Sequence, residues 1–330
     1  MDVSDKTEFV GSRRDLLKGA GVAGIAGAGG LVVGSAVLPF AATPAAAMMH
    51  SGGVGRFSRT VEIGSFKVST LLDGARTVPN PQSIFGMNVS AEEFSQVSAA
   101  NFLPDDEARF YFTPTVVETG SDVVLFDTGN GGDNGNLPNA LADVGLSMSD
   151  VTIVVLTHYH PDHIGGLMRP DGASFPNARY VSGSVEHNFW TGSNAPAQMV
   201  DRINSLVVPF AENMTFLEDG GSVVSGITAM KAFGHTPGHM GYMIESDGQQ
   251  LMLIADLANH YVWSLAYPDW EVRFDADKEA AAASRRSILG MLAADRVPFI
   301  GYHMPFPALG FVEANGDGFR YAPVSYQFEL

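Results

Sequence analysis

Short apolar runs, most of them rich in β-branched residues, recur along the chain after about residue 50 and are separated by glycine, proline and polar residues. Two such runs between residues 57 and 72 meet at Gly64, which is typical of a β-hairpin. The run at 151–156 is almost wholly apolar, as in a strand that is buried on both faces of a sheet. The same patterns predict strands at 111–119, 123–126, 178–181, 227–232, 240–245, 251–254 and 298–302.

Two stretches have the apolar spacing of helices, at about 201–207 and about 276–294. Strands mixed with helices predict an α/β protein built in layers. The chain has no sequence period that would indicate a repeat fold, and no Pro-, Gly- or Ser-rich linker divides its main part. We therefore expect one domain over residues 48–330.

The beginning of the chain resembles a twin-arginine export signal. Paired arginines, Arg13 and Arg14, precede a Gly/Ala-rich, mildly apolar segment that ends in small residues near Ala47. The glycines lower both its hydrophobicity and its helix propensity, so no stable membrane anchor is expected. Residues 1–47 are then a cleaved signal, and the protein is expected in the periplasm or outside the cell.

The charge and the absence of cysteine limit the chemistry. Acidic residues outnumber basic ones by 36 to 19, which gives a formal net charge of −17. Nucleic acid would be repelled, so it is not expected as a partner, and small neutral or cationic substrates are favoured. The chain has no cysteine, which excludes thiolate nucleophiles and thiolate metal ligands. Imidazole and carboxylate groups must hold any metal ion.

A cluster of such groups follows the apolar strand at 151–156, in the sequence Thr-His-Tyr-His-Pro-Asp-His. His158 and His160 are two positions apart, so in an extended chain they share a face and can point at one ion. Asp162 and His163 follow a proline, where the chain should turn, and can face a second ion. Imidazole and carboxylate are the ligands that Zn²⁺ takes when no thiolate is offered.

Two ions need more ligands than one loop supplies, and single His and Asp residues stand at later strand ends. His235 lies in the turn sequence Gly-His-Thr-Pro-Gly-His after an apolar strand. Asp256 and His303 each follow directly after an apolar run. The pattern therefore predicts that distant segments complete the site.

The order His-x-His-x-Asp-His, Gly-His-Thr-Pro-Gly-His, a lone Asp and a lone His resembles the metallo-β-lactamase superfamily, over about residues 57–324. The resemblance implies a four-layer αββα sandwich with the metals at one edge of its two sheets. It also implies how the ligands divide. The first ion would be held by His158, His160 and His235, the second by Asp162, His163 and His303, and Asp256 would bridge both.

Two further residues match supporting positions of that family. Asp127, in the sequence Leu-Phe-Asp-Thr-Gly, corresponds to an early aspartate that usually braces the ligand loop. His239 is expected to support the site without binding a metal ion.

Within the superfamily, the chain most resembles methyl parathion hydrolase and its relatives, in the stretches 156–168, 186–190 and 318–324. Trp190 falls where those enzymes have a pocket aromatic. Phe189 is a neighbouring candidate for substrate binding, and His260 is another because it is a polar residue four positions after Asp256. For each aromatic residue, ordinary packing is an equally good interpretation.

Two ions that share a water lower its pKa and polarise a carbonyl or phosphoryl oxygen of the substrate, so no protein nucleophile is needed. We therefore expect a binuclear hydrolase that uses metal-bound hydroxide on small neutral esters, such as organophosphate triesters, lactones or aryl esters. Asp162 and Asp256 are the expected catalytic residues, because they fix the metals and can shuttle a proton. Zinc is the default ion, and manganese, cobalt and iron tolerate the same ligands.

Other functions stay open. An acyl-homoserine lactonase is the nearest rival, but quorum-quenching lactonases usually carry a tyrosine three residues after the bridging aspartate, where this chain has Asn259. A β-lactamase is a further option, since export would place the enzyme where β-lactamases act. A metal-binding or redox protein without hydrolytic activity is the alternative outside the enzymes. The oligomeric state is also open, with a homodimer as one option.

Overall fold

The computed structural model describes residues 51–54 and 56–324. The predicted export signal at 1–47 lies outside the described residues. Within them, no helix combines the length and the apolar character needed to cross a membrane.

The first of two large sheets has eight strands, antiparallel from β1 to β7 and parallel from β7 to β12. In spatial order they are β1 (Ser51–Val54), β2 (Ser58–Ile63), β3 (Phe66–Leu71), β6 (Thr115–Glu118), β7 (Val123–Phe126), β8 (Ile153–Leu156), β11 (Arg179–Gly183) and β12 (Met214–Leu217).

The second sheet has seven strands, of which only β16 and β17 pair in parallel. In spatial order they are β13 (Ser222–Val224), β14 (Ile227–Lys231), β15 (Met240–Ser246), β16 (Gln249–Ala255), β17 (Phe299–Gly301), β18 (Leu309–Asn315) and β19 (Gly318–Pro323).

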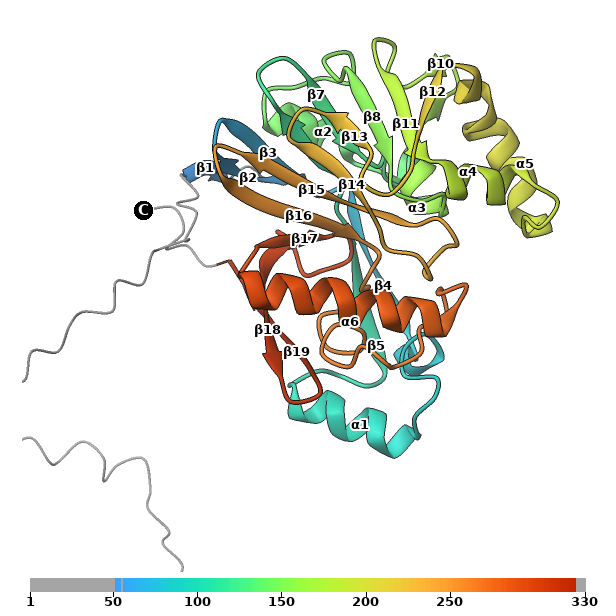
Figure 1. Ribbon diagram of the computed structural model, residues 1–330. Helices are drawn as coiled ribbons and strands as arrows, with labels where there is room; N and C mark the ends of the chain where they lie inside the picture. Colours follow the sequence, from blue (N-terminus) through green and yellow to red (C-terminus); the bar gives the residue numbers. More distant parts are fainter. Residues whose placement is uncertain (1–50, 55, 325–330) are drawn as a thin grey trace, which may run out of the picture. The chain divides into compact units, whose positions relative to one another are not determined.

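Helices cover the outer face of each sheet (Figure 1). One buried cluster joins the first sheet to α2 and α5, and a second fills the space between the sheets and continues to α6. Phe126 and Tyr242, from opposite sheets, meet in this central core with ring centroids 5.1 Å apart. The predicted four-layer αββα sandwich is confirmed. The helices are α1 (Ala91–Ala100), α2 (Leu137–Asp143), α3 (Pro161–Ile164), α4 (Ser184–Thr191), α5 (Ala197–Leu206) and α6 (Lys278–Asp295).

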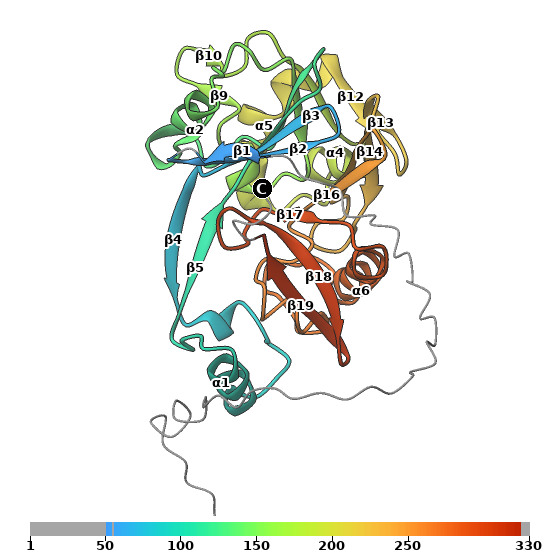
Figure 2. The same cartoon turned by 90° about the vertical axis from the view of Figure 1, so that its left-hand side faces the viewer.

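A long two-stranded hairpin, β4 (Gly74–Pro79) with β5 (Glu107–Phe112), extends away from the first sheet and carries α1 near its far end (Figure 2). A third buried cluster forms where this arm packs against residues 262–272. Phe94 of α1 and Trp263 lie at its centre, with ring centroids 5.0 Å apart. The arm is therefore fixed to the body by aromatic packing rather than left free.

The remaining elements are short. They are η1 (Pro81–Ser83), η2 (Gly132–Asn134), η3 (Val208–Asn213), β9 (Met168–Arg169) and β10 (Gly172–Ala173).

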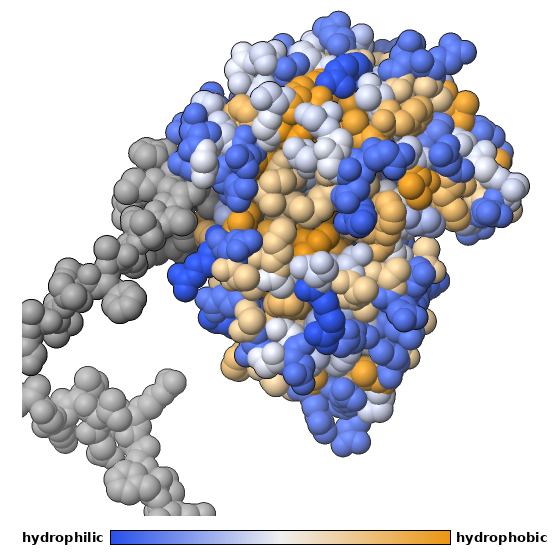
Figure 3. Space-filling model, viewed as in Figure 1, coloured by the Kyte–Doolittle hydropathy of each residue, from blue (hydrophilic) through white to orange (hydrophobic). Residues whose placement is uncertain are grey.

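On the face in Figure 3, hydrophilic residues cover most of the upper and lower parts, and apolar residues gather across the middle.

Local chemistry explains where the main helices begin. Ser90 caps α1, because its hydroxyl accepts a hydrogen bond from the Glu93 backbone N–H at 3.1 Å. Asp277 caps α6 in the same way, through the backbone N–H of Ala280 at 3.0 Å. The first residue beyond α6, Arg296, has a left-handed backbone, which ends the helix.

The sequence predictions of the other strands are confirmed with small shifts at their ends, but the single strand predicted at 111–119 is wrong. It is two strands in different sheets, because β5 ends at Phe112 and β6 begins at Thr115. Pro114, which lies between them, has no N–H to donate to a ladder. The helix predicted at 201–207 is also longer, since α5 begins at Ala197.

Candidate metal centre

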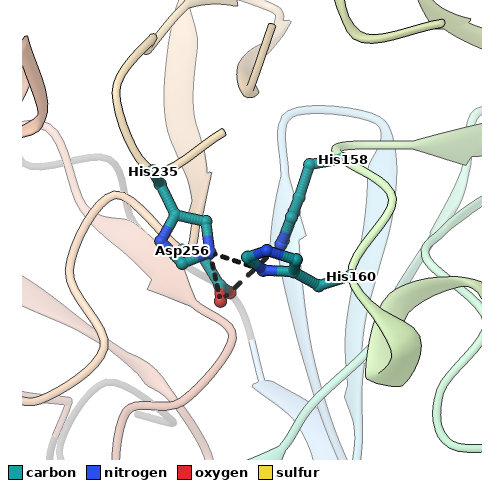
Figure 4. A group of neighbouring side chains, drawn as sticks. All are labelled: His158, His160, His235 and Asp256. Atoms are coloured by element: carbon teal, nitrogen blue, oxygen red, sulfur yellow. Dashed lines mark hydrogen bonds and ion pairs between the residues drawn. The ribbon is translucent and has the colours of Figure 1, made fainter. Parts of the chain in front are cut away.

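The seven predicted metal ligands lie together at one edge of the two sheets. His158, His160 and the α3 residues follow β8, while His235, Asp256 and His303 follow β14, β16 and β17. The ligand atoms of His158, His160, His235 and Asp256 are all within 4.8 Å of one another, and so are those of Asp162, His163 and His303. The family resemblance implied the same division, and by this distance Asp256 belongs to the first group. Figure 4 shows the first group.

Asp256 lies between the two groups and is almost completely buried. Its Oδ2 is 3.2 Å from Nε2 of His235 and 3.2 Å from Nε2 of His303. Its Oδ1 is 3.2 Å from Nε2 of His163. The carboxylate therefore reaches both groups at once, as a bridging ligand must.

The outer nitrogens of four imidazoles, those of His158, His163, His235 and His303, are each engaged by a protein oxygen. Nδ1 of His163 donates to Asp127 Oδ2 at 2.7 Å, and Nδ1 of His303 donates to the backbone carbonyl of Tyr111 at 2.8 Å. Because an ionised carboxylate and a carbonyl only accept, each Nδ1 must carry the proton. In the neutral ring, Nε2 then has the lone pair and points at the site, which is the tautomer that a metal ligand requires.

His158 is fixed through a two-step chain. Its Nδ1 lies 3.0 Å from the hydroxyl of Thr157, which itself donates to Asp127 Oδ2 at 2.8 Å. The hydroxyl has one proton, so it accepts from Nδ1 of His158, and Nε2 again keeps its lone pair. Asp127 thus braces two ligand candidates, and its left-handed backbone (φ 61°) is a strained conformation of the kind found at functional sites.

His160 is the exception, because it faces the group through Nδ1. This atom lies 2.9 Å from Nε2 of His235, and the two rings are nearly perpendicular. Two ring nitrogens so close together converge on one point, as two ligands of one ion would.

Some buried polar atoms of the site make no hydrogen bond of normal geometry to a protein group. Among the described residues these include Nε2 of His158, Nε2 of His163 and Oδ1 of Asp256. A buried polar atom without a partner costs about 1–3 kcal/mol. Nε2 of His163 and Oδ1 of Asp256 lie 3.2 Å apart, so their ion pairing reduces this cost, whereas Nε2 of His158 is 3.8 Å from Asp256 Oδ2. Divalent cations would satisfy all three, because each atom offers a lone pair. The donor set of imidazoles and carboxylates fits ions of the zinc type.

Asp162 completes the second group and is its most exposed member, with 22% of its side chain accessible. Its Oδ2 lies 3.4 Å from Nε2 of His303 and 3.6 Å from Nε2 of His163. Asp162 is therefore the carboxylate that connects the site with solvent.

Burial and neighbouring charges together set the pKa values of the site. Burial lowers the pKa of His158 and of His160 well below the usual value. Burial also lowers the pKa of His163, but the carboxylates of Asp256, Asp127 and Asp162 outweigh it and raise that pKa well above the usual value. Burial raises the pKa of Asp256, but the neighbouring imidazoles outweigh it and hold that pKa well below the usual value.

His239 supports Asp256 from behind. Its Nδ1 donates to the carbonyl of Ala232 and its Nε2 accepts the backbone N–H of Asp256, both at 3.1 Å. Both ring nitrogens are used, so His239 has none left for a metal ion. Burial lowers its pKa to about 3, which keeps the ring neutral.

The sequence interpretation missed a buried ion pair behind His235. Nδ1 of His235 donates to Asp275 Oδ1 at 3.0 Å, and the guanidinium of Arg285 in α6 donates to Asp275 Oδ2 at 2.8 Å. Both charged residues are buried. Asp275 stands 40 positions from His235. No local pattern connects them.

The predicted pocket residues have different surroundings. Trp190 is buried with its ring centroid 6.0 Å from that of His160, and Phe189 packs edge-on against Trp190. His260 stacks on Trp263 at 4.0 Å, and its Nδ1 accepts the backbone N–H groups of Val262 and Trp263. The structure therefore brings Trp190 to the site, whereas the ring contacts of His260 are with the aromatic cluster of the arm.

An aromatic wall that the sequence interpretation missed stands beside the second group. Phe110 and Phe112 of β5 meet the ring of His303 edge-on, at 5.5 Å and 5.6 Å. Phe274 lies 6.4 Å from Phe110 and is 41% exposed. The only signal in the sequence was the alternation of two phenylalanines in one strand.

Metal binding should strengthen as the pH rises to about 9. Burial lowers the pKa of His235, but hydrogen bonds to Asp256 and Asp275 outweigh it and raise that pKa to about 9. An ion binds only the neutral imidazole, so below this pH it must displace a proton. For this one proton, the affinity for Zn²⁺ should fall about tenfold per pH unit.

Chelator competition at several pH values measures this slope. Asp275→Asn is the matched variant. In this variant the Zn²⁺ affinity should begin to fall only at a lower pH, because one of the groups that raise the pKa of His235 is lost. A Zn²⁺ affinity that does not change with pH would contradict the assignment of His235.

The comparisons with known proteins agree with this geometry. A family model described as the metallo-beta-lactamase superfamily matches residues 113–299. Metallo-beta-lactamase domain-containing protein 1 of Mus musculus is 44% identical over 66 residues, which are 20% of this chain and 22% of that protein. An N-acyl homoserine lactonase of Bacillus sp is 27% identical over 109 residues, 33% of this chain and 39% of that protein. The alignments thus span less than half of either relative.

Solved structures match over much more of the chain. AidC, a dizinc quorum-quenching lactonase in complex with a product, is 29% identical with a TM-score of 0.74, over 82% of this chain and 98% of that one. The hydrolase AbOPH has the same TM-score at 21% identity, over 84% and 99% of the two chains, which shows a shared fold. With the family model matching more than half of its length, this chain belongs to the metallo-β-lactamase superfamily.

Proposed function

We propose that this protein is a two-metal hydrolase of small neutral esters, and that its first substrate class is the lactones. The observation that carries the proposal is the pair of ligand groups that share Asp256, with imidazole lone pairs directed at both. The likeness to a dizinc lactonase at 29% identity supports the choice of lactones. Zinc is the proposed metal because imidazole and carboxylate suit it.

The residues of the site would have different roles in binding the two ions and in moving a proton. His158, His160 and His235 would hold the first ion, and Asp162, His163 and His303 the second. When bound, two such ions supply a water of lowered pKa and a Lewis acid for the oxygen of the ester. Asp256 fixes the distance between the two groups. Asp162 reaches solvent and can carry a proton between the site and bulk water.

The walls of the site favour an uncharged substrate. Phe110 and Phe112 stand beside the second group, Phe274 packs against Phe110, and Trp190 stands beside the first group. Aromatic side chains offer apolar contact for an acyl or aryl group. The net charge of −17 also disfavours anionic substrates.

An aryl phosphotriester is the second candidate class. Asn259 occupies the position where quorum-quenching lactonases usually carry a tyrosine, and its side-chain amide donates to Asp256 Oδ2 at 2.9 Å. The likeness to methyl parathion hydrolase, seen in sequence motifs alone, points to the same class. The export signal at 1–47, and with it a periplasmic or secreted location, also stays a proposal from the sequence.

Metal analysis tests the proposed centre. The purified protein should contain about two divalent ions per chain. His160→Ala should lose ions and lower kcat/KM at least about 100-fold, since it removes a ligand of the first ion. His187→Ala is the matched control, because His187 contacts Tyr159 and Phe216 rather than the ligand groups. A metal-free protein with full activity would contradict the proposal.

A substrate panel tests the ester class. We expect the highest kcat/KM for an N-acyl homoserine lactone, compared with a paraoxon-like triester, an aryl ester and a cephalosporin. A preference for the triester would favour the second candidate. Turnover of the cephalosporin alone would be evidence for a β-lactamase and against both classes.

The aromatic wall can be tested by truncation. Phe274→Ala should raise KM for a long-chain substrate about fivefold with little change in kcat, because about 1 kcal/mol of apolar contact is lost equally from substrate and transition state. The control variant Phe216→Ala removes a similarly exposed phenylalanine (39%) whose ring contacts that of His187. Equal KM values for the two variants would show that Phe274 does not contact substrate.

A further inference from the structure

Glu186 is a completely buried carboxylate in the first turn of α4. Its Oε1 accepts hydrogen bonds from the backbone N–H of Tyr159 at 2.9 Å and from the indole N–H of Trp190 at 2.6 Å. Its Oε2 accepts from the hydroxyl of Thr236 at 2.7 Å and from the backbone N–H of Gly238 at 3.0 Å. One side chain thus satisfies four donors.

These donors belong to the segments that surround the first group of ligands. Tyr159 stands between His158 and His160, and Thr236 directly follows His235. Glu186 therefore ties together the two loops that contain all three histidines of this group. The oxygen Oε1, which accepts from Tyr159 in the loop of His158 and His160, also accepts from Trp190, whose ring stands beside His160.

The backbone is shaped for this contact. A Cβ atom on Gly238 would lie 2.0 Å from the backbone nitrogen of Glu186, so only glycine allows the second loop to approach the helix so closely. The loops also meet directly, because the backbone N–H of Met240 donates to the carbonyl of Thr157 at 3.1 Å.

Burying a carboxylate is costly, and all four groups that donate to Glu186 are neutral. An apolar side chain of the same volume would avoid that cost but would leave the four buried donors without an acceptor. A carboxylate fixes the positions of the groups that donate to it, because each of its oxygens accepts two hydrogen bonds at preferred angles.

We propose that Glu186 is a positioning residue that sets the distance between the two loops of the first group and the orientation of Trp190. This inference rests on the proposed metal centre and is independent of the substrate. Asp127 and the carbonyl of Tyr111 hold His163 and His303 instead. Loss of Glu186 should therefore affect the first ion more than the second.

Glu186→Gln is the first test, because an amide has the same shape but must direct its NH₂ group at two donors in either orientation. We expect the affinity of the first Zn²⁺ to fall about 10- to 100-fold, and that of the second less than about threefold. Chelator competition measures both affinities, and the absorption of the Co²⁺-loaded protein reports the ligand geometry. Glu218→Gln is the matched control, since the exposed Glu218 accepts from Ser184 in the same helix but contacts neither loop.

Thr236→Val and Thr236→Ser provide a second test that does not depend on the folding of the first variant. Valine removes one of the four donors while keeping the shape of the side chain, and it should lower the affinity for the first Zn²⁺ about tenfold. Serine keeps the hydroxyl and should retain most of the affinity.

The results separate this inference from the proposed function. If Glu186→Gln or Thr236→Val bound both ions with wild-type affinity, the role of Glu186 would be overturned. An equal loss of affinity for the two ions would overturn it as well. A wild-type protein that binds no metal would instead overturn the proposed metal centre.

Discussion

The carboxylate of Asp256, buried among imidazole nitrogens, is the contact on which the rest of the site depends. Four Nε2 atoms, from His158, His163, His235 and His303, lie between 3.2 Å and 3.8 Å from it. Such a group can be assembled only if strands of both sheets end at the same edge. The αββα arrangement meets this condition, because β8 of one sheet and β16 and β17 of the other lead directly to ligand candidates.

Holding these groups in place requires hydrogen bonds well beyond them. Asp127, Asp275 and the carbonyl of Tyr111 each fix a proton on the outer side of an imidazole. Asp275 is itself neutralised by Arg285, so the helix α6 contributes to the site without supplying a ligand. The geometry at the centre is thus set by residues that would never bind an ion themselves.

Local spacing explains how the sequence pointed to residues that the structure brings together. Alternation in an extended chain placed His158 and His160 together, and strand ends marked Asp256 and His303. The supporting contacts were beyond such reasoning. The carbonyl of Tyr111 carries no sequence signal, and an arginine within a helix, such as Arg285, usually faces solvent. The division of 111–119 into two strands was missed because every residue there suits a strand except Pro114.

The hairpin β4–β5 contacts His303 in two separate ways. The backbone carbonyl of Tyr111 accepts the hydrogen bond from Nδ1 of His303, while the side chains of Phe110 and Phe112 form the wall beside the ring. A backbone carbonyl is present whatever side chain the residue carries. Substitutions in this arm can therefore alter the apolar surface beside the centre while the backbone contact that orients His303 is kept.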